Sequence, residues 1–224
     1  MYRNELKFII NTHQKILMAN KLRNLCQRDS FSDAAGGYLI SSLYFDDYNQ
    51  SAFFDKTNGI RDRKKFRIRV YNYQSDVIKL ERKTKRGNLT DKSHLQISRE
   101  EYDQLVRGDV SFLSHKDDGV AKDFYLYYRT KNLRTRVVVE YRREAYIYQY
   151  GDVRICFDTL LKAGVFQGDL FSNGHRIPVI PPDQIILEVK YTGYLPDVIR
   201  NLIQLNSLQW QSISKYAKCF VVGL

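Results

Sequence analysis

The sequence predicts an α+β fold, an antiparallel β-barrel with helices packed on its outside. Three observations support this prediction. Several segments alternate charged and apolar residues with the period of a half-buried strand. Most of these segments follow one another with short connections, which is typical of antiparallel neighbours. Amphipathic helical segments lie between some of them and can cover the apolar side of the sheet, which leaves the charged side to line the interior.

The N-terminal part of the chain predicts strand, helix, strand and a short helix. Residues 2–10, YRNELKFII, alternate charged and apolar side chains, and Thr12 is expected to cap the helix that follows. The segment YLISSLYFDD (38–47) indicates a second strand, and a short helical stretch is expected around 48–56. This part of the chain therefore supplies two strands of the sheet.

The middle of the chain predicts three strands in succession, over residues 61–73, 76–85 and 88–97. Ser98 and Glu101 have the spacing of a capping box, so a helix is expected to begin there. Residues 117–130 favour a helix, although their segment DFYLYYRT is also compatible with extended backbone.

The C-terminal part predicts three more strands, over residues 134–148, 152–158 and 183–193. Residues 162–182 are expected to form loops with short strands. The stretch from Pro196 to Phe220 is expected to be helical. Because no repeat, low-complexity tract or Pro/Gly/Ser-rich linker divides the sequence, we expect a single domain over residues 1–224.

Charge is the most unusual property of the composition. The 36 Lys and Arg residues exceed the 25 Asp and Glu residues and leave a formal net charge of +11, which favours a polyanionic partner. No stretch approaches the ~20 apolar residues of a membrane helix, and no signal-peptide pattern opens the sequence. The 3 isolated cysteines and 4 scattered histidines favour neither disulfides nor zinc. We therefore expect a cytoplasmic protein without direct membrane insertion.

The segment GIRDRKKFRIRVYNY has five cations at alternate positions, namely Arg61, Arg63, Lys65, Arg67 and Arg69. On a strand they would share one face, with neighbours ~7 Å apart. For one strand alone, a solvated face is the more ordinary interpretation. Because the excess is cationic and several strands have such a face, we favour a barrel with the charged face inside. Cations in such an interior require an anion to compensate them.

A series of short motifs spans nearly the whole chain: RNELKF, SLYFDD, RKKFRIRVY, LERKTK, EYRREAY, RICFD, LEVKY and SKYAKC. In this order they resemble the VTC domain, the polyphosphate polymerase domain of the vacuolar transporter chaperone proteins. That domain belongs to the triphosphate tunnel metalloenzyme superfamily, together with the CYTH proteins. The resemblance implies a hydrophilic tunnel through an antiparallel barrel. It also implies transfer of the terminal phosphate of ATP to polyphosphate, assisted by Mn²⁺ or Mg²⁺.

The resemblance, with the charged faces described above, assigns roles to individual residues. The residues expected at the catalytic centre are Lys7, Arg67, Arg69 and Lys215. The residues expected to bind the other substrate phosphates are Lys83, Lys92, Arg143, Arg154 and Lys190, of which Lys190 shares the charged face of ILEVKY with Glu188. Glu188 is the expected principal metal carboxylate. Glu5 is either a second metal ligand or the ion-pair partner of a neighbouring cation.

Residue types suggest further roles around this site. The cations Arg61, Arg63 and Lys65 are expected near the tunnel entrance, where they would steer anions. Tyr44 and Tyr71 are expected to pack rather than contact a nucleotide. Asp158 is expected to orient a cation of the interior.

Three functions remain open on these observations. The leading hypothesis is a metal-dependent polyphosphate polymerase that uses ATP or another nucleoside triphosphate, since phosphoryl transfer depends on positioning and charge neutralisation. Tunnel triphosphatases of the CYTH kind usually begin with Glu-x-Glu-x-Lys, whereas Arg3 stands at the first of these positions. This lost carboxylate disfavours hydrolysis of triphosphate or NTP, the second hypothesis. A non-catalytic module that binds polyphosphate, or less plausibly nucleic acid, is the third, and the oligomeric state is left open.

Overall fold

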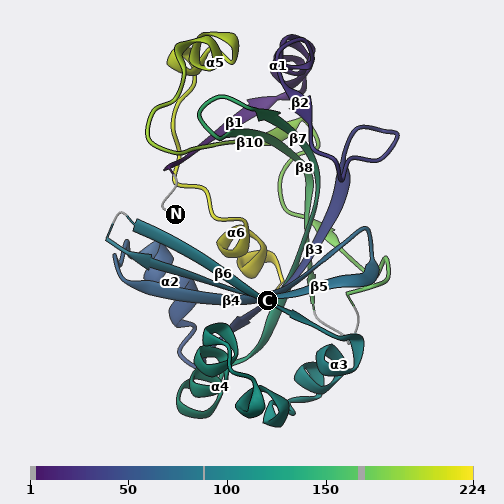
Figure 1. Ribbon diagram of the computed structural model, residues 1–224, viewed down its shortest axis with the longest axis vertical. Coiled ribbons are helices and arrows are strands. Elements are labelled where there is room, and N and C mark those ends of the chain that lie inside the picture. The colour runs from purple at the N-terminus through teal and green to yellow at the C-terminus, as the bar shows by residue number, and fades with distance from the viewer. Residues whose placement is uncertain (1–3, 88, 166–169, 224) are drawn as a thin grey trace. The chain divides into compact units, whose positions relative to one another are not determined.

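The computed structural model describes residues 4–87, 89–165 and 170–223 (Figure 1). The strands are β1 (Asn4–Asn11), β2 (Gln27–Arg28), β3 (Tyr38–Asp46), β4 (Arg63–Tyr71), β5 (Gln74–Arg86), β6 (Leu89–Ile97), β7 (Arg134–Tyr148), β8 (Val153–Val165), β9 (Ile177–Pro178) and β10 (Gln184–Tyr191). The α-helices are α1 (Thr12–Arg23), α2 (Ser51–Thr57), α3 (Arg99–Arg107), α4 (Gly119–Lys131), α5 (Asp197–Leu202) and α6 (Lys215–Val222). Two short 3₁₀ helices are η1 (Ser111–His115) and η2 (Leu205–Ser207).

The ten strands are linked by hydrogen bonds in the order β1-β10-β8-β7-β3-β4-β5-β6, with β2 on β7 and β9 on β8. The strand pairs with a described register, such as β1 with β10 and β4 with β5, are antiparallel. The α+β class with a mostly antiparallel sheet is thus confirmed.

The chain divides into two compact units. Unit 1 comprises Met1–Leu39, Tyr141–Leu161 and Ile180–Ile213, and unit 2 comprises Ile40–Glu140, Lys162–Val179 and Ser214–Leu224. The strands β3, β7 and β8 each belong partly to both units. Each unit has its own apolar core.

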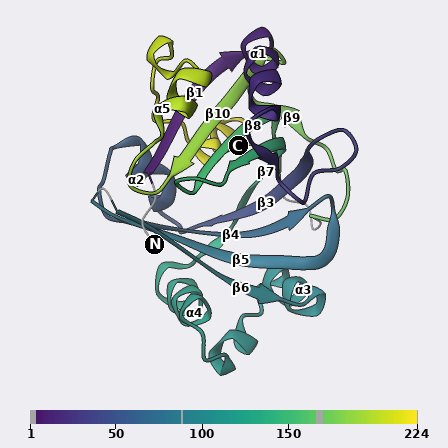
Figure 2. The ribbon, with the colours of Figure 1, turned by 45° about the horizontal axis from the view of Figure 1, so that its top comes forward.

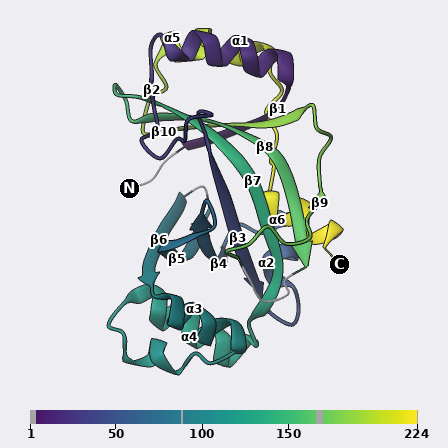
Figure 3. The same ribbon diagram turned by 90° about the vertical axis from the view of Figure 1, so that its right-hand side faces the viewer.

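In unit 1, α1 and α5 run side by side over the apolar face of β1, β10 and β8 (Figure 3). Phe8 of β1 and Leu187 of β10 pack there with Leu22 of α1 and Ile199 of α5, all at most 3% exposed. Because strand residues alternate between faces, Lys7 and Glu188 point to the other side.

In unit 2, α3 and α4 cover the apolar face of β4, β5 and β6 (Figure 2). Ile68 and Leu80 pack there with Tyr102 of α3 and Phe124 of α4, all fully buried. The helices α2 and α6 contact each other on the opposite side of these strands (Figure 1). The charged residues of β4 and β5 therefore point toward the side of α2 and α6.

Two predicted helix starts are confirmed and one is corrected. Ser98 and Glu101 form the expected capping box of α3. Residues 117–130, for which helix was favoured over extended backbone, contain the helix α4. The Asp118 carboxylate starts this helix because it accepts two N–H groups of the first turn. The cap of α1 is Asn11 rather than Thr12, since Asn11 and Gln14 form a reciprocal capping box.

The predicted C-terminal helix is wrong as one element. Helix α5 ends at Leu202, and the residues between η2 and α6 are not helical. The N–H of Gln211 donates to the carbonyl of Lys7, which ties this segment to β1. A strand-like backbone contact of this kind competes with helical hydrogen bonds, so α6 begins anew after Ser214.

The remaining differences concern strand ends and termini. Strand β4 begins at Arg63, so Arg61 lies outside the row of alternating residues. Strand β8 continues to Val165, into the region expected to form loops with short strands, and β9 is a short strand of that region. The first three residues, Arg3 among them, lie outside the described part. No helix of the described residues is long and apolar enough to cross a membrane.

Candidate functional site

Arg67 and Arg69 lie on the face of β4 opposite the apolar core of unit 2. The Arg67 Nε and Nη2 atoms lie 2.6 and 2.5 Å from Oε2 of Glu81 on β5. Its Nη1 donates to the Tyr44 hydroxyl over 2.6 Å. Arg69 is only 5% exposed, and its Nε donates to the hydroxyl of Ser42 over 3.2 Å. Neighbouring strands thus fix both guanidinium groups in place.

Glu81 is the carboxylate at the centre of this face. It is 2% exposed, and its Oε1 lies 2.8 Å from the ammonium of Lys92 on β6. Burial alone would raise the pKa of Glu81, but Arg67, Arg69 and Lys92 hold it far below its usual range. Desolvation and the two guanidinium groups lower the pKa of Lys92 to about 7. Three cations surround one carboxylate, so this face has excess positive charge.

Lys83 extends the same face. It lies opposite Lys65 on β4 and opposite Lys92 on β6, and its side chain is exposed. Directly opposite side chains in antiparallel strands are ~5 Å apart at Cβ, where like charges repel. The row of three lysines adds to the cationic excess around Glu81.

Lys215 is the first residue of α6, and that helix is fixed by the residues beside it. The Ser214 side chain caps the helix. The Tyr216 hydroxyl donates to buried Asp46 over 2.5 Å, and its ring stacks on Tyr44 with centroids 4.9 Å apart. Asp46 also accepts N–H groups from the first turn of α2. Lys215 is therefore anchored in unit 2, as are Arg67 and Arg69.

Unit 1 holds a second charged cluster, on β1 and β10. The Lys7 ammonium lies 3.6 Å from Glu5 and 3.7 Å from Glu188. The Lys190 ammonium lies 3.7 Å from Glu5 and 3.1 Å from Glu188. Burial would lower the pKa of Lys190, but the two carboxylates outweigh burial and raise it. Two carboxylates on adjacent strands thus share two cations.

Arg143 joins this cluster from β7. Its Nε and Nη2 atoms donate to both oxygens of Asp158 over 2.6 and 2.7 Å, and Nη2 also donates to Glu188 over 2.9 Å. Burial opposes the charged form, but these carboxylates raise the pKa of Arg143 well above its ordinary value. The orienting contact expected of Asp158 is therefore made to Arg143.

Arg154 on β8 has separate partners in unit 1. Its Nη2 contacts buried Asp29 and the hydroxyl of Tyr38, the latter at 2.8 Å. Lys190 lies opposite Arg154 in the β10–β8 register. The predicted site residues are thus brought together in two groups, with Lys7, Arg143, Arg154, Glu188, Lys190 and Glu5 in unit 1. The group in unit 2 contains Arg67, Arg69, Lys83, Lys92 and Lys215.

The residues proposed for a metal pass a test of donor chemistry. Magnesium and manganese favour carboxylate oxygens, and Mg²⁺ often takes only one or two carboxylates together with phosphate and water. Glu5 and Glu188 already share the cations Lys7 and Lys190, so a divalent ion could take up the same negative charge. Within the described ranges, no group of three or more His, Cys, Asp or Glu side chains could hold a metal. Glu5 and Glu188 therefore fit a divalent ion that is held jointly with phosphate.

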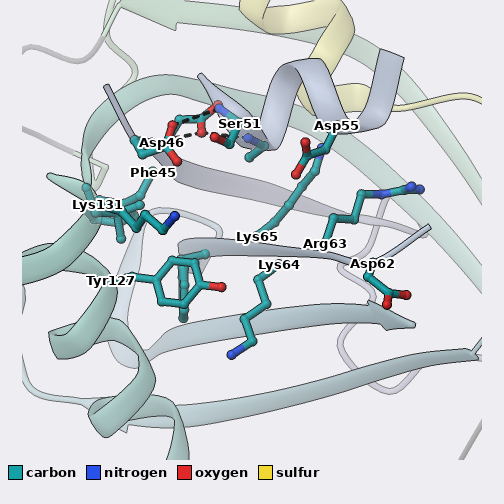
Figure 4. A pocket seen from close by; sticks show the side chains of 14 residues that line it. Phe45, Asp46, Ser51, Asp55, Asp62, Arg63, Lys64, Lys65, Tyr127 and Lys131 are labelled. Atoms are coloured by element: carbon teal, nitrogen blue, oxygen red, sulfur yellow. Dashed lines mark hydrogen bonds between the residues drawn. The ribbon is translucent and has the colours of Figure 1, made fainter. Parts of the chain in front are cut away.

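The predicted entrance residues have different environments. Arg61 is exposed, whereas Arg63 and Lys65 line a pocket with Asp46 and Asp55 (Figure 4). The Lys65 ammonium lies over the Tyr216 ring. Lys65 is therefore a partly buried residue of unit 2, and its steering role stays a prediction.

Several supporting residues were not predicted from the sequence. The alternation of Glu81 with Lys79 and Lys83 in VIKLERK predicted that it lies on the charged face, but not that it pairs with Arg67 and Lys92. Asp29 and Tyr216 have no comparable pattern. Their roles depend on contacts with Arg154 and Asp46, far away in the chain.

Solved structures show the class of fold. A Bacillus halodurans protein provisionally named an adenylate cyclase has a TM-score of 0.53 at 12% identity, over 92% of this chain and 89% of that chain. A Vibrio parahaemolyticus protein with the same provisional name has a TM-score of 0.51 at 10% identity, over 96% and 95%. At such identities the likeness concerns the fold alone.

The family follows from the sequence profile of the VTC domain, which matches residues 2–222. This chain belongs to the VTC domain family. The resemblance inferred from the ordered motifs is confirmed. No curated protein matches the chain in sequence.

Proposed function

We propose that this protein is a metal-dependent phosphotransferase that binds ATP and polyphosphate and extends polyphosphate with the terminal phosphate of ATP. The cationic excess on the charged face of unit 2 is the observation that supports it. Arg67 and Lys92 share the carboxylate of Glu81, the charge of Arg69 acts on the same carboxylate, and Lys83 adds a further charge. A multiply charged phosphate chain would balance this face.

The residue types suit the reaction. Arg67 and Arg69 are held by Glu81 and Ser42, so their planar groups are oriented before a substrate binds. Pre-oriented cations neutralise the charge that spreads over phosphate oxygens in the transition state. The attacking atom would be an oxygen of the terminal phosphate of the chain, and ADP would leave with the bridging oxygen. The reaction therefore requires no nucleophilic side chain.

In unit 1, Glu188 and Glu5 would hold the divalent ion, and Arg143 and Lys190 would bind phosphate oxygens beside it. When bound, Mn²⁺ or Mg²⁺ would neutralise phosphate charge and orient the transferred group. Asp158 would keep the Arg143 guanidinium in one orientation, because it accepts two of its N–H groups. A cytoplasmic location remains a prediction.

A product assay tests the proposal. Purified protein would be incubated with ATP and Mn²⁺ or Mg²⁺, and the products resolved by gel electrophoresis and phosphorus NMR. Long phosphate chains are expected. Orthophosphate as the sole product would indicate hydrolysis and refute polymerisation. Tight binding of ATP without any turnover would indicate a binding module.

A double variant tests the site itself. Arg67→Ala with Arg69→Ala is expected to abolish measurable tripolyphosphate binding, because both guanidinium groups lie on the cationic face. The matched control is Arg107→Ala with Arg129→Ala, which removes the same charge from exposed positions on α3 and α4. Equal affinity in the two double variants would refute the assignment of this face.

A further inference from the structure

Lys65 has an environment that the proposed site does not yet explain. Its ammonium lies 4.6 Å from the centroid of the Tyr216 ring. Within residues 4–87, 89–165 and 170–223, it makes no hydrogen bond or ion pair. The ring is held in position because the Tyr216 hydroxyl donates to Asp46. Lys65 thus has a fixed apolar surface beneath it and no acidic group bound to its ammonium.

The charge of Lys65 is not needed to fill this space. Desolvation lowers its pKa to about 7, assisted by Arg63 on the same strand. Lys56 of α2 and Lys83 of β5 act in the same direction, and Asp46 of β3 opposes them. An apolar side chain would cover the Tyr216 ring without this electrostatic cost. The presence of a cation here therefore points to an anionic ligand.

The strand register gives the geometry of that ligand. Lys65, Lys83 and Lys92 lie opposite one another on β4, β5 and β6. With neighbouring strands ~4.8 Å apart, the row spans roughly 10 Å across the sheet. Among the three, Lys92 is paired with Glu81. A row of this length suits a linear anion with several charges better than a single orthophosphate.

We propose that Lys65 binds phosphate, and that with Lys83 and Lys92 it forms a row of three ammonium groups that holds one stretch of a linear polyphosphate chain. The inference rests on the proposed function and adds a residue to its site. It also replaces the steering role expected of Lys65 with direct contact. The Lys65–Lys83 pair lies two residues along β4 and β5 from the Arg67–Glu81 pair and on the same face, so both can contact the same chain.

The neighbouring residue Lys64 provides a matched control. Lys64 and Lys65 point to opposite sides of β4 (Figure 4). Lys64 also lies over a tyrosine ring, that of Tyr127 at 5.1 Å, but its ammonium is paired with Asp123 at 2.9 Å. Lys64→Met and Lys65→Met therefore remove the same charge and the same kind of ring contact from opposite faces.

The test is calorimetric titration of each full-length variant with inorganic tripolyphosphate and with orthophosphate at pH 6.5. Lys65→Met is expected to weaken tripolyphosphate binding roughly ten- to a hundredfold, the range for a lost charge-assisted contact. Lys64→Met is expected to keep the wild-type affinity, and orthophosphate binding is expected to change less than tripolyphosphate binding. Lys65→Arg is expected to restore the affinity at pH 6.5.

The outcomes separate the inference from the function on which it rests. If wild-type protein does not bind tripolyphosphate, both fail. If wild type binds and Arg67→Ala with Arg69→Ala does not, while Lys65→Met matches Lys64→Met, only the role of Lys65 is refuted. If Lys65→Met does not fold, Lys65→Arg decides. Because arginine stays charged, the tripolyphosphate affinity of Lys65→Arg must fall less between pH 6.5 and 9 than the affinity of wild type does. A pH profile equal to that of wild type overturns the inference.

Discussion

The two charged clusters differ in how their charge is balanced. In unit 1 the cations Lys7, Arg143 and Lys190 meet the carboxylates Glu5, Asp158 and Glu188. In unit 2 the cations Lys65, Arg67, Arg69, Lys83 and Lys92 lie on one face, where Glu81 is the carboxylate that pairs with Arg67 and Lys92. A balanced cluster is stable without a ligand, whereas a cationic excess is relieved by an anion. The first suits a metal held with phosphate, and the second suits the phosphate chain.

Removing Glu188 should have the largest effect on stability. Glu188→Ala removes one carboxylate from buried Arg143 and removes an ion-pair partner from Lys7 and Lys190. Breaking a buried ion pair typically costs about 3–5 kcal/mol, and we expect a loss of this size in the free energy of unfolding, measured with urea. Asp103→Ala, which breaks an exposed pair on α3, is the control and should cost less than about 1 kcal/mol. Equal losses would contradict the view that unit 1 depends on its internal balance.

Removing the carboxylate of unit 2 should have a smaller effect that a ligand reverses. Glu81→Gln leaves Arg67 and Lys92 without their charged partner, at a cost of about 1–3 kcal/mol. Because an added anion can replace that charge, tripolyphosphate should raise the melting temperature of Glu81→Gln more than that of wild type. Glu188→Gln should not show this gain. The same ligand-induced shift in all three proteins would remove the distinction between the clusters.

Proton uptake should accompany phosphate binding in unit 2. Desolvation, assisted by the neighbouring cations, lowers the pKa values of Lys65 and Lys92 from 10.5 to about 7. A lysine whose pKa is lower in the folded state than in the unfolded state destabilises the folded protein while it is charged. This loss of stability is complete below the folded pKa of about 7 and disappears as the pH rises toward the unfolded pKa of 10.5. An anion favours the charged form, so tripolyphosphate affinity should fall as pH rises above about 7. Titrations at pH 8 in buffers of different ionisation enthalpy would measure the uptake, which Lys65→Arg with Lys92→Arg should abolish.

Glu5 should have the smallest effect on stability. Its side chain is 26% exposed, and its carboxylate lies 3.6 Å from Lys7 and 3.7 Å from Lys190, so Glu5→Gln should lower the free energy of unfolding by less than about 1 kcal/mol. If Glu5 is a metal ligand, the same change should weaken Mn²⁺ binding, followed by paramagnetic resonance of the free ion. Unchanged Mn²⁺ binding would leave Glu5 as an ion-pair partner of Lys7 and Lys190.

Strand patterns were predicted well because each depends on a short stretch of sequence. The alternation in RKKFRIRVY predicted β4 to within two residues, and the charged faces of β1, β5 and β10 followed in the same way. The C-terminal helix was predicted wrongly, since a contact between Gln211 and Lys7, 204 positions apart in the sequence, decides its break. The contact of Lys65 with the Tyr216 ring on α6 was not predictable either, because the two residues are far apart in the sequence.

The sequence by itself determined the class of fold, the family and the cationic character of the site, because periodicity, motifs and composition are local or additive properties. The tertiary structure decided which cations have a carboxylate partner. Arg143 and Arg67 look alike in the sequence, yet one is bound by Asp158 and Glu188 and the other shares Glu81 with Lys92. Coulombic interaction and desolvation depend on distances in space, and strand register sets those distances.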